Sequence, residues 1–310
     1  MTRHILGIDG GGSRTRARIA LRSGEAVSTG EAGPSGVSAN GFDGAQRAIL
    51  DATRAALKTA GLREADCEFE AACMGLSGVD RPAEREVMLS WARAALAPAV
   101  EVVNDVELVL AAGTPARWGV ALIAGTGSIG LGRAPDGRAV RAGGWGYRFG
   151  DEGSGYDLAR EALRAASQAA DGRGTPTRLL ADILGFWELT DPSGLIPKVY
   201  RSGLKPADLA ALAPLVTAAA HDGDAIAAAI VTRAGASLAQ IVQAVARALD
   251  FGADPTPLAL AGGLLLGAGG LREALMASLS GSGRTFAPVG EAREPVAGAV
   301  AIARSLLEGN

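Results

Sequence analysis

The chain opens with short apolar runs of the kind that form β-strands. Residues 4–9 form the first run, and residues 14–21 form a second in which apolar side chains occupy alternate positions. A turn at residues 23–25 leads into a third run at residues 26–31. Alternation with a period of two is typical of strands. The pattern therefore predicts a three-stranded meander whose first turn holds the glycines at 10–12.

The same pattern returns in the middle of the chain. An apolar run at residues 119–124 precedes a glycine turn at residues 125–128, and further runs follow at residues 129–133 and 138–143. One supersecondary unit repeated at a spacing of roughly 115 residues indicates an internal duplication. We therefore expect each copy to open one domain, with the boundary near residues 113–116.

Helical periodicity fills most of the remaining sequence, because apolar side chains recur three and four residues apart. The predicted helices lie at residues 42–60, 82–96, 104–113, 154–170, 175–184, 206–220, 224–249, 271–279 and 296–307, and further strands at residues 68–75, 100–103 and 257–261.

Composition and charge argue against some classes of partner. The 310 residues are 48% hydrophobic and carry a net charge of −3, with lysine and arginine scattered along the chain, which argues against a nucleic-acid partner. The most apolar stretch, residues 257–271, is too short to span a bilayer. No leader pattern follows Arg3. We therefore expect a cytoplasmic protein without a membrane partner, in which Cys67 and Cys73 are buried, reduced thiols.

Asp9 and the segment Gly10-Gly11-Gly12-Ser13 form the first candidate site. Successive N–H groups in a glycine turn can bind an anion, and a carboxylate at a strand end can hold a metal-bound water of Mg²⁺. The alternative is an ordinary hairpin turn with a solvated aspartate.

The second glycine turn matches the dinucleotide fingerprint through Gly125, Gly127 and Gly130. That fingerprint requires a helix directly after the turn, whereas this sequence predicts a strand. We therefore favour a phosphate-binding turn between two strands. Near the end of the chain, Gly262-Gly263 follows a predicted strand and either lets the backbone approach a nucleotide or makes a simple strand–helix turn.

Two further segments carry carboxylates at predicted element ends. Asp105 lies between a strand and a helix, where it can be a general base or a helix N-cap. Residues 143–154 combine glycines, aromatic side chains and acids just before a helix. This composition favours sugar binding over a surface loop capped by Asp151 or Ser154.

Together these motifs resemble the actin/hexokinase/heat-shock-chaperone superfamily. Within it the chain resembles the N-acetylglucosamine and glucosamine kinases of the BadF/BadG/BcrA/BcrD-type ATPase family. The most specific matches are residues 7–13, 125–128 and 143–154. The resemblance implies an α/β fold of two actin-like (ribonuclease H-like) domains, each a mixed sheet flanked by helices, with the active site in the cleft between them. The expected domains are residues 1–115, on which a helix at about 294–310 packs back, and residues 116–293.

The resemblance also implies ATP and Mg²⁺ as cofactors and an amino sugar as substrate. Asp9 would organise the metal, and Asp105 would be the base for the 6-hydroxyl of the sugar. Nucleotide contacts are implied for Gly11, Gly12, Ser13, Thr126, Gly127, Gly262 and Gly263. Sugar contacts are implied for Ser35, Gly36, Asp105, Thr126, Gly144, Trp145 and Asp151.

The identity of the sugar depends on one departure from the family pattern. Gly36 stands where resembling N-acetylglucosamine kinases often have asparagine, although Asn40 follows closely. Asp43, Asp151 and Glu152 could instead pair with a cationic amine. The sequence therefore leans towards glucosamine, with N-acetylglucosamine next.

Two other functions share this fold. Activator ATPases of dehydratases and reductases hold an iron–sulfur cluster on thiolates, but Cys67 and Cys73 do not match their pattern. A sugar-binding regulator without catalysis is the other alternative, although Asp9 and Asp105 are both present. Dimers are common in the resembling families, so we expect a homodimer.

Overall fold

The computed structural model describes residues 3–308 except residues 80, 202, 253 and 268–269. The chain divides into two compact units. The first contains Met1–Trp118 and Glu294–Asn310, and the second contains Gly119–Arg293.

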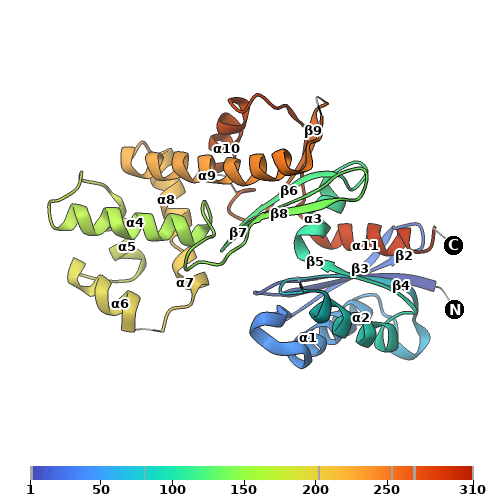
Figure 1. The fold of residues 1–310 in the computed structure, drawn as a ribbon. Helices are drawn as coiled ribbons and strands as arrows, with labels where there is room; N and C mark the ends of the chain where they lie inside the picture. The colour runs from blue at the N-terminus through green and yellow to red at the C-terminus, as the bar shows by residue number, and fades with distance from the viewer. Residues whose placement is uncertain (1–2, 80, 202, 253, 268–269, 309–310) are drawn as a thin grey trace. The chain divides into compact units, whose positions relative to one another are not determined.

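The first unit is built on a mixed five-stranded sheet (Figure 1). The strand order is β3-β2-β1-β4-β5. Strands β1, β2 and β3 pair antiparallel, whereas β1, β4 and β5 run parallel. The strands are β1 (Arg3–Gly10), β2 (Thr15–Leu21), β3 (Ala26–Ala32), β4 (Glu68–Leu76) and β5 (Ala99–Asn104).

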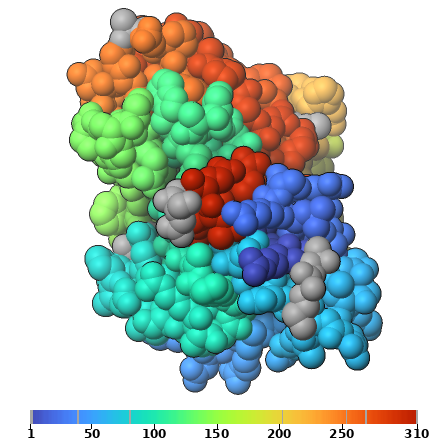
Figure 2. Space-filling model, turned by 90° about the vertical axis from the view of Figure 1, so that its right-hand side faces the viewer, coloured from blue at the N-terminus to red at the C-terminus, as the bar shows by residue number. Residues whose placement is uncertain are grey.

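Helices cover both faces of this sheet. Helices α1 (Val37–Thr59) and α2 (Pro82–Ala95) share a core with Leu6 and Ile8 of β1. On the other face α3 (Asp105–Gly113) and α11 (Pro295–Ser305) pack around Ile5. Figure 2 shows the C-terminal helix, in red, against the blue N-terminal strands. A short 3₁₀ turn, η1 (Glu64–Asp66), precedes β4.

The second unit repeats the strand topology of the first. Its sheet has the order β10-β9-β6-β7-β8. Strands β6, β7 and β8 are antiparallel neighbours, and β6, β9 and β10 are parallel. The strands are β6 (Gly119–Ala124), β7 (Ser128–Arg133), β8 (Ala139–Gly143), β9 (Thr256–Ala261) and β10 (Phe286–Glu291). Strands β6 to β10 thus take the places of β1 to β5. The predicted fold class of two mixed sheets flanked by helices is confirmed.

The helices of the second unit share one large core with its sheet. They are α4 (Gly155–Ala170), α5 (Leu179–Phe186), α6 (Leu195–Arg201), α7 (Pro206–Ala210), α8 (Ala213–His221), α9 (Ala225–Leu249) and α10 (Leu271–Ser280), with the 3₁₀ turn η2 (Pro192–Gly194). Among the described residues only α9 is long and apolar enough to cross a membrane. Half of its most apolar window is buried, and it packs against β7 and β8, as expected of a core helix.

Several predicted elements differ from the structure. The helix predicted at residues 206–220 is two helices, α7 and α8, separated by a turn at Ala211 and Leu212. Gly41 interrupts α1 with a φ of 67°. Helix α6 and strand β10 were not predicted. Strand β10 contains a proline and lacks a clear alternation, so it carries little of the local signal that marks a strand.

Candidate functional site

Three polar side chains follow neighbouring strands at one edge of the first sheet. In the parallel ladder Gly10 lies opposite Leu76, and Leu76 lies opposite Asn104. Asp9, Ser77 and Asp105 therefore lie at or just beyond the carboxyl ends of β1, β4 and β5. Ligands of open α/β sheets bind outside this edge.

The carboxylate of Asp9 is in an unusual electrostatic environment. Burial raises the pKa of Asp9 to about 6, against the opposing pull of Arg16 and Arg14. No described residue donates a hydrogen bond to this carboxylate. A buried carboxylate without a donor is well suited to accept from a water bound to a cation.

The donor set at Asp9 fits a magnesium ion carried by a nucleotide. Within the described ranges, no three histidine, cysteine or acidic side chains come together to form a metal site. Mg²⁺ usually keeps several waters and takes only one or two carboxylates plus phosphate oxygens. One carboxylate beside a glycine turn therefore suits this ion better than zinc, which needs three or four protein ligands.

The first glycine turn is tied to the loop that precedes α1. The N–H of Gly11 donates to the carbonyl of Arg14 at 3.0 Å, and the Gly11 carbonyl accepts from the N–H groups of Ser35 and Gly36 at 3.2 and 3.1 Å. Gly12 and Ser13, in contrast, are exposed. The turn is held in place on one side and open on the other, as a phosphate-binding turn requires.

The loop residues Ser35 and Gly36, for which the resemblance implies sugar contacts, are both buried. Ser35 is fully buried, and its hydroxyl has no hydrogen-bond partner. Its side chain packs against Gly10. A Cβ atom on Gly36 would lie 2.9 Å from the hydroxyl of Ser77. Gly36 therefore leaves room for Ser77, a residue that sequence reasoning missed although it follows β4 at the same sheet edge.

Asp105 is the first residue of α3, and its neighbour supplies the cap. The Oδ1 atom of Asn104 accepts the N–H of Val106 at 3.1 Å. The N-cap role considered for Asp105 therefore belongs to Asn104. The half-buried Asp105 carboxylate thus stays a candidate base.

The second glycine turn lies between β6 and β7 and leads into a strand. The N–H of Gly125 donates to the carbonyl of Gly127 at 2.9 Å. The Gly125 carbonyl accepts from the N–H of Gly155 at 2.7 Å, which ties the turn to the start of α4. Gly130 lies within β7, where a Cβ atom would come 2.6 Å from Ile241 of α9. The prediction that this motif is not a dinucleotide fingerprint is confirmed.

Asp151 brings a carboxylate to this turn from the loop after β8. A Cβ atom on Gly127 would lie 2.8 Å from the Oδ2 atom of Asp151, and the N–H of Ser128 donates to its Oδ1 at 3.4 Å. Burial raises the pKa of Asp151, while the hydrogen bonds from the backbone of Ser128 and Gly146 oppose the change. Asp151 has a φ of 57°, a conformation that is uncommon for residues other than glycine.

The rest of the 143–154 loop is partly open to solvent. Gly144 has a φ of 69° and packs on Ile129. The Trp145 ring is 66% exposed, with the guanidinium of Arg141 5.8 Å from its centroid. Ser154 caps α4, because its hydroxyl accepts the N–H of Asp157 at 3.2 Å. The capping role considered for Asp151 or Ser154 thus belongs to Ser154, which leaves Asp151 at the turn.

Gly262 and Gly263 begin the loop after β9. Gly262 has a φ of 98°, and a Cβ atom there would lie 2.2 Å from the carbonyl oxygen of Ala124. Only glycine allows this approach between the ends of β9 and β6. Gly263 is exposed and faces a cavity.

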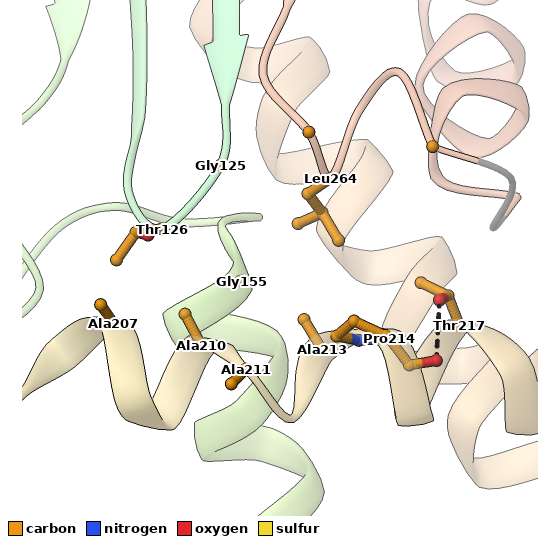
Figure 3. Close-up of a pocket in the computed structure, with 12 residues that line it drawn as sticks. Gly125, Thr126, Gly155, Ala207, Ala210, Ala211, Ala213, Pro214, Thr217 and Leu264 are labelled. Carbon is orange, nitrogen blue, oxygen red and sulfur yellow. Dashed lines mark hydrogen bonds between the residues drawn. The ribbon is translucent and has the colours of Figure 1, made fainter. Parts of the chain in front are cut away.

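This cavity of about 510 Å³ lies wholly within the second unit (Figure 3). Its lining residues come from the glycine turn, the start of α4, helices α7 and α8, and the loop after β9. They are Gly125, Thr126, Gly155, Ala207, Ala210, Ala211, Ala213, Pro214, Thr217, Gly263, Leu264 and Gly267. The size is that of a small-molecule site. Sequence reasoning found the two glycine segments but missed the α7–α8 wall, whose only signal is small side chains at helical spacing.

Comparisons with known proteins found one family, relatives of similar sequence and structures of similar fold. The model of the BadF/BadG/BcrA/BcrD ATPase family matches residues 6–303. An N-acetylmuramic acid/N-acetylglucosamine kinase of Clostridium acetobutylicum is 35% identical over 85% of this chain and 86% of its own length. An N-acetyl-D-glucosamine kinase of Dictyostelium discoideum is 30% identical over 84% of both chains. The crystal structure of a Chromobacterium violaceum protein, provisionally assigned as an N-acetylglucosamine kinase, superposes with a TM-score of 0.75 at 31% identity, covering 96% of this chain and 98% of that one.

Proposed function

The chain belongs to the BadF/BadG/BcrA/BcrD ATPase family, and from this premise we propose that it is an ATP-dependent kinase of an N-acetylated amino sugar. The observation that supports this most is the cavity of the second unit. It adjoins a backbone turn with an exposed Thr126, and the Asp151 carboxylate lies beside that turn. Such a site can hold a triphosphate and a hydroxyl-bearing substrate side by side.

In the proposed reaction the nucleotide occupies this cavity. Its phosphates would lie on the glycine turns, where N–H groups bind anions. A Mg²⁺ ion held through Asp9 would neutralise phosphate charge during the transfer. Thr126 and Gly127 would contact the γ-phosphate, and Gly262 and Gly263 would let the nucleotide approach the backbone.

The sugar would be held by Gly144, Trp145 and Asp151 in the second unit and by the Gly36 loop in the first. Asp105 would accept the proton of the sugar 6-hydroxyl, which then takes the γ-phosphoryl group and releases ADP. A positioned base contributes about 10²–10⁴-fold to such a step.

The two relatives described above favour an N-acetylated sugar over the glucosamine towards which the loop carboxylates lean. Both curated relatives described above are named for N-acetyl sugars. The clostridial name adds N-acetylmuramic acid, which carries a lactyl ether. We therefore place N-acetylglucosamine first, N-acetylmuramic acid second and glucosamine third.

The thiols argue against the activator-ATPase alternative. Cys73 is fully buried in the middle of β4, and burial raises the pKa of its thiol well above the ordinary value. Cys67 is half-buried beside His4, with 3.6 Å between sulfur and Nδ1. A thiol enclosed in the sheet cannot reach an exposed cluster, and Cys67 alone cannot supply the several thiolates that an iron–sulfur cluster needs.

The test is a measurement of ADP release with MgATP and a panel of sugars. We expect the highest kcat/KM with N-acetylglucosamine and a phosphate on its 6-oxygen, located by phosphorus NMR of the product. A preference for glucosamine would overturn the choice of sugar. ATP turnover without any phosphorylated sugar would overturn the kinase proposal itself.

A further inference from the structure

The cavity of the second unit has an end that is poor in polar side chains. In Figure 3 Thr126 lies at one end and Thr217 at the other, with Ala210, Ala213 and Pro214 between them on α7 and α8. If the triphosphate lies on the turn at Thr126, as the proposed function has it, the base of the nucleotide lies among these small side chains.

Thr217 is the one polar side chain that the described lining offers at this end. It is buried, and its hydroxyl donates to the carbonyl of Pro214 in its own helix at 3.1 Å. A hydroxyl has one hydrogen that rotates and can also accept. Its oxygen can therefore accept a second hydrogen bond while the bond to Pro214 stays in place, either from the 6-amino group of adenine or from the N1–H or 2-amino group of guanine.

The backbone between α7 and α8 offers little to read a base. The N–H of Ala211 donates to the carbonyl of Ala207 at 3.1 Å, and the N–H of Leu212 donates to the carbonyl of Leu209 at 3.0 Å. These donors are used within the segment. The Thr217 end of the cavity, which we call the base end, is thus lined by methyl groups and a proline ring. The backbone N–H groups of Ala211 and Leu212 nearby are already hydrogen-bonded.

Such a lining separates ligands by shape more than by hydrogen bonding. Pockets built to hydrogen-bond a particular group reject an analogue without it by about 10⁴–10⁵, whereas apolar pockets separate near-isosteres by only about 10–200-fold. We infer that the donor site accepts purine nucleoside triphosphates as a class, with a discrimination between ATP and GTP no larger than an apolar pocket gives, below about 200-fold. Each donor would give its γ-phosphoryl group to the same sugar hydroxyl and leave as its diphosphate.

This inference rests on the proposed function, so binding and transfer are measured separately. A fluorescent ATP analogue is bound to the full chain with Mg²⁺ and displaced by the non-hydrolysable imido analogues of ATP and GTP. Sugar phosphate formed from ATP, GTP and ITP is then quantified directly. We expect dissociation constants and kcat/KM values within about 200-fold of one another. A larger preference for either purine in either measurement would overturn the inference.

Two variants make the test specific to the base end of the cavity. Thr217→Val should change the affinities for the two imido analogues by the same factor, because its hydroxyl favours neither base. A loss confined to the adenine analogue would show that Thr217 reads adenine and would overturn the inference. The matched control is Thr232→Val, which removes an exposed hydroxyl bonded within α9 at 2.9 Å and should alter neither affinity.

The outcomes also separate this inference from the kinase proposal. Equal binding of both analogues without sugar phosphorylation would support donor tolerance and sink the kinase. Failure of both analogues to bind would overturn the nucleotide site and this inference with it.

Discussion

Replacing Asp9 by asparagine should make the protein more stable while it removes activity. The reason is the cost of holding a buried charge in place for function. Burial raises the pKa of Asp9 from 3.8 to about 6. One pKa unit corresponds to about 1.4 kcal/mol, so ionised Asp9 destabilises the folded state by roughly 3 kcal/mol at neutral pH. Asparagine keeps the volume and removes the charge. The substitution should therefore raise the unfolding free energy by at most about 3 kcal/mol, because a buried amide also loses its hydration.

The sign of the pH dependence follows from proton binding. Between pH 3.8 and about 6 the folded state holds a proton on Asp9 that the unfolded state has released. Raising the pH through this window therefore lowers the unfolding free energy of the wild type. The Asp9→Asn variant lacks this group, so its advantage should be near zero below pH 4 and complete above about pH 7.

The assay is urea unfolding followed by circular dichroism at several pH values between 4 and 8, in buffer with EDTA. Asp51→Asn is the matched control, because it makes the same chemical change on an exposed carboxylate of α1 that pairs with Arg54 at 3.4 Å. We expect Asp51→Asn to change the unfolding free energy by less than about 1 kcal/mol, and this change should not increase between pH 4 and 6. Saturating MgATP should stabilise the wild type more than Asp9→Asn and so narrow the gap. A variant that is less stable than the wild type at pH 8 would refute the reasoning.

Three further substitutions address the rest of the site. Asp105→Asn should lower kcat by about 10²-fold or more while nucleotide binding is retained, and near-normal turnover would remove Asp105 from the mechanism. Gly127→Ala should raise the KM for sugar or nucleotide, because the added Cβ would lie 2.8 Å from the Asp151 carboxylate. Gly185→Ala is its control: the added Cβ would have no neighbour within 4 Å, so both KM values should stay unchanged. Trp145→Ala should raise the KM for the sugar without loss of stability, because the ring is 66% exposed, and an unchanged sugar KM would show that the ring does not contact the substrate.

The repeated sheet could be predicted because its signals are local. Alternating side chains and a glycine turn occur twice in the same order, and the structure has the same strand pairing after each turn. Helix boundaries were harder to predict at Asn104 and Asp105. Both residue types cap helices well, and a shift of one position decides which of them does. The cap belongs to Asn104, and the general-base interpretation of Asp105 stays a prediction.

The wall of the cavity could not be predicted for a different reason. Ala207, Ala210 and Thr217 are unremarkable helix residues whose role depends on which face packs and which remains open. A sequence pattern shows that a helix has small residues but not that a void lies beside them. The burial of Ser35 is a similar case. Its position beside Gly36 suggests a ligand contact, but tertiary packing places its hydroxyl behind Gly10.

The two repeats place a buried carboxylate beside the glycine turn in different ways. Each sheet offers a glycine turn after its first strand, and each turn has a carboxylate nearby whose pKa is raised by burial. In the first unit that carboxylate is Asp9, which belongs to the strand itself. In the second unit it is Asp151, which returns from the loop after β8 to lie beside Gly127. A residue on the strand is fixed by the sheet, whereas one on a loop can change with the ligand it must hold. Under the proposed function, this difference would suit Asp9 to the metal, which is the same in every turnover, and Asp151 to the sugar, which varies between substrates.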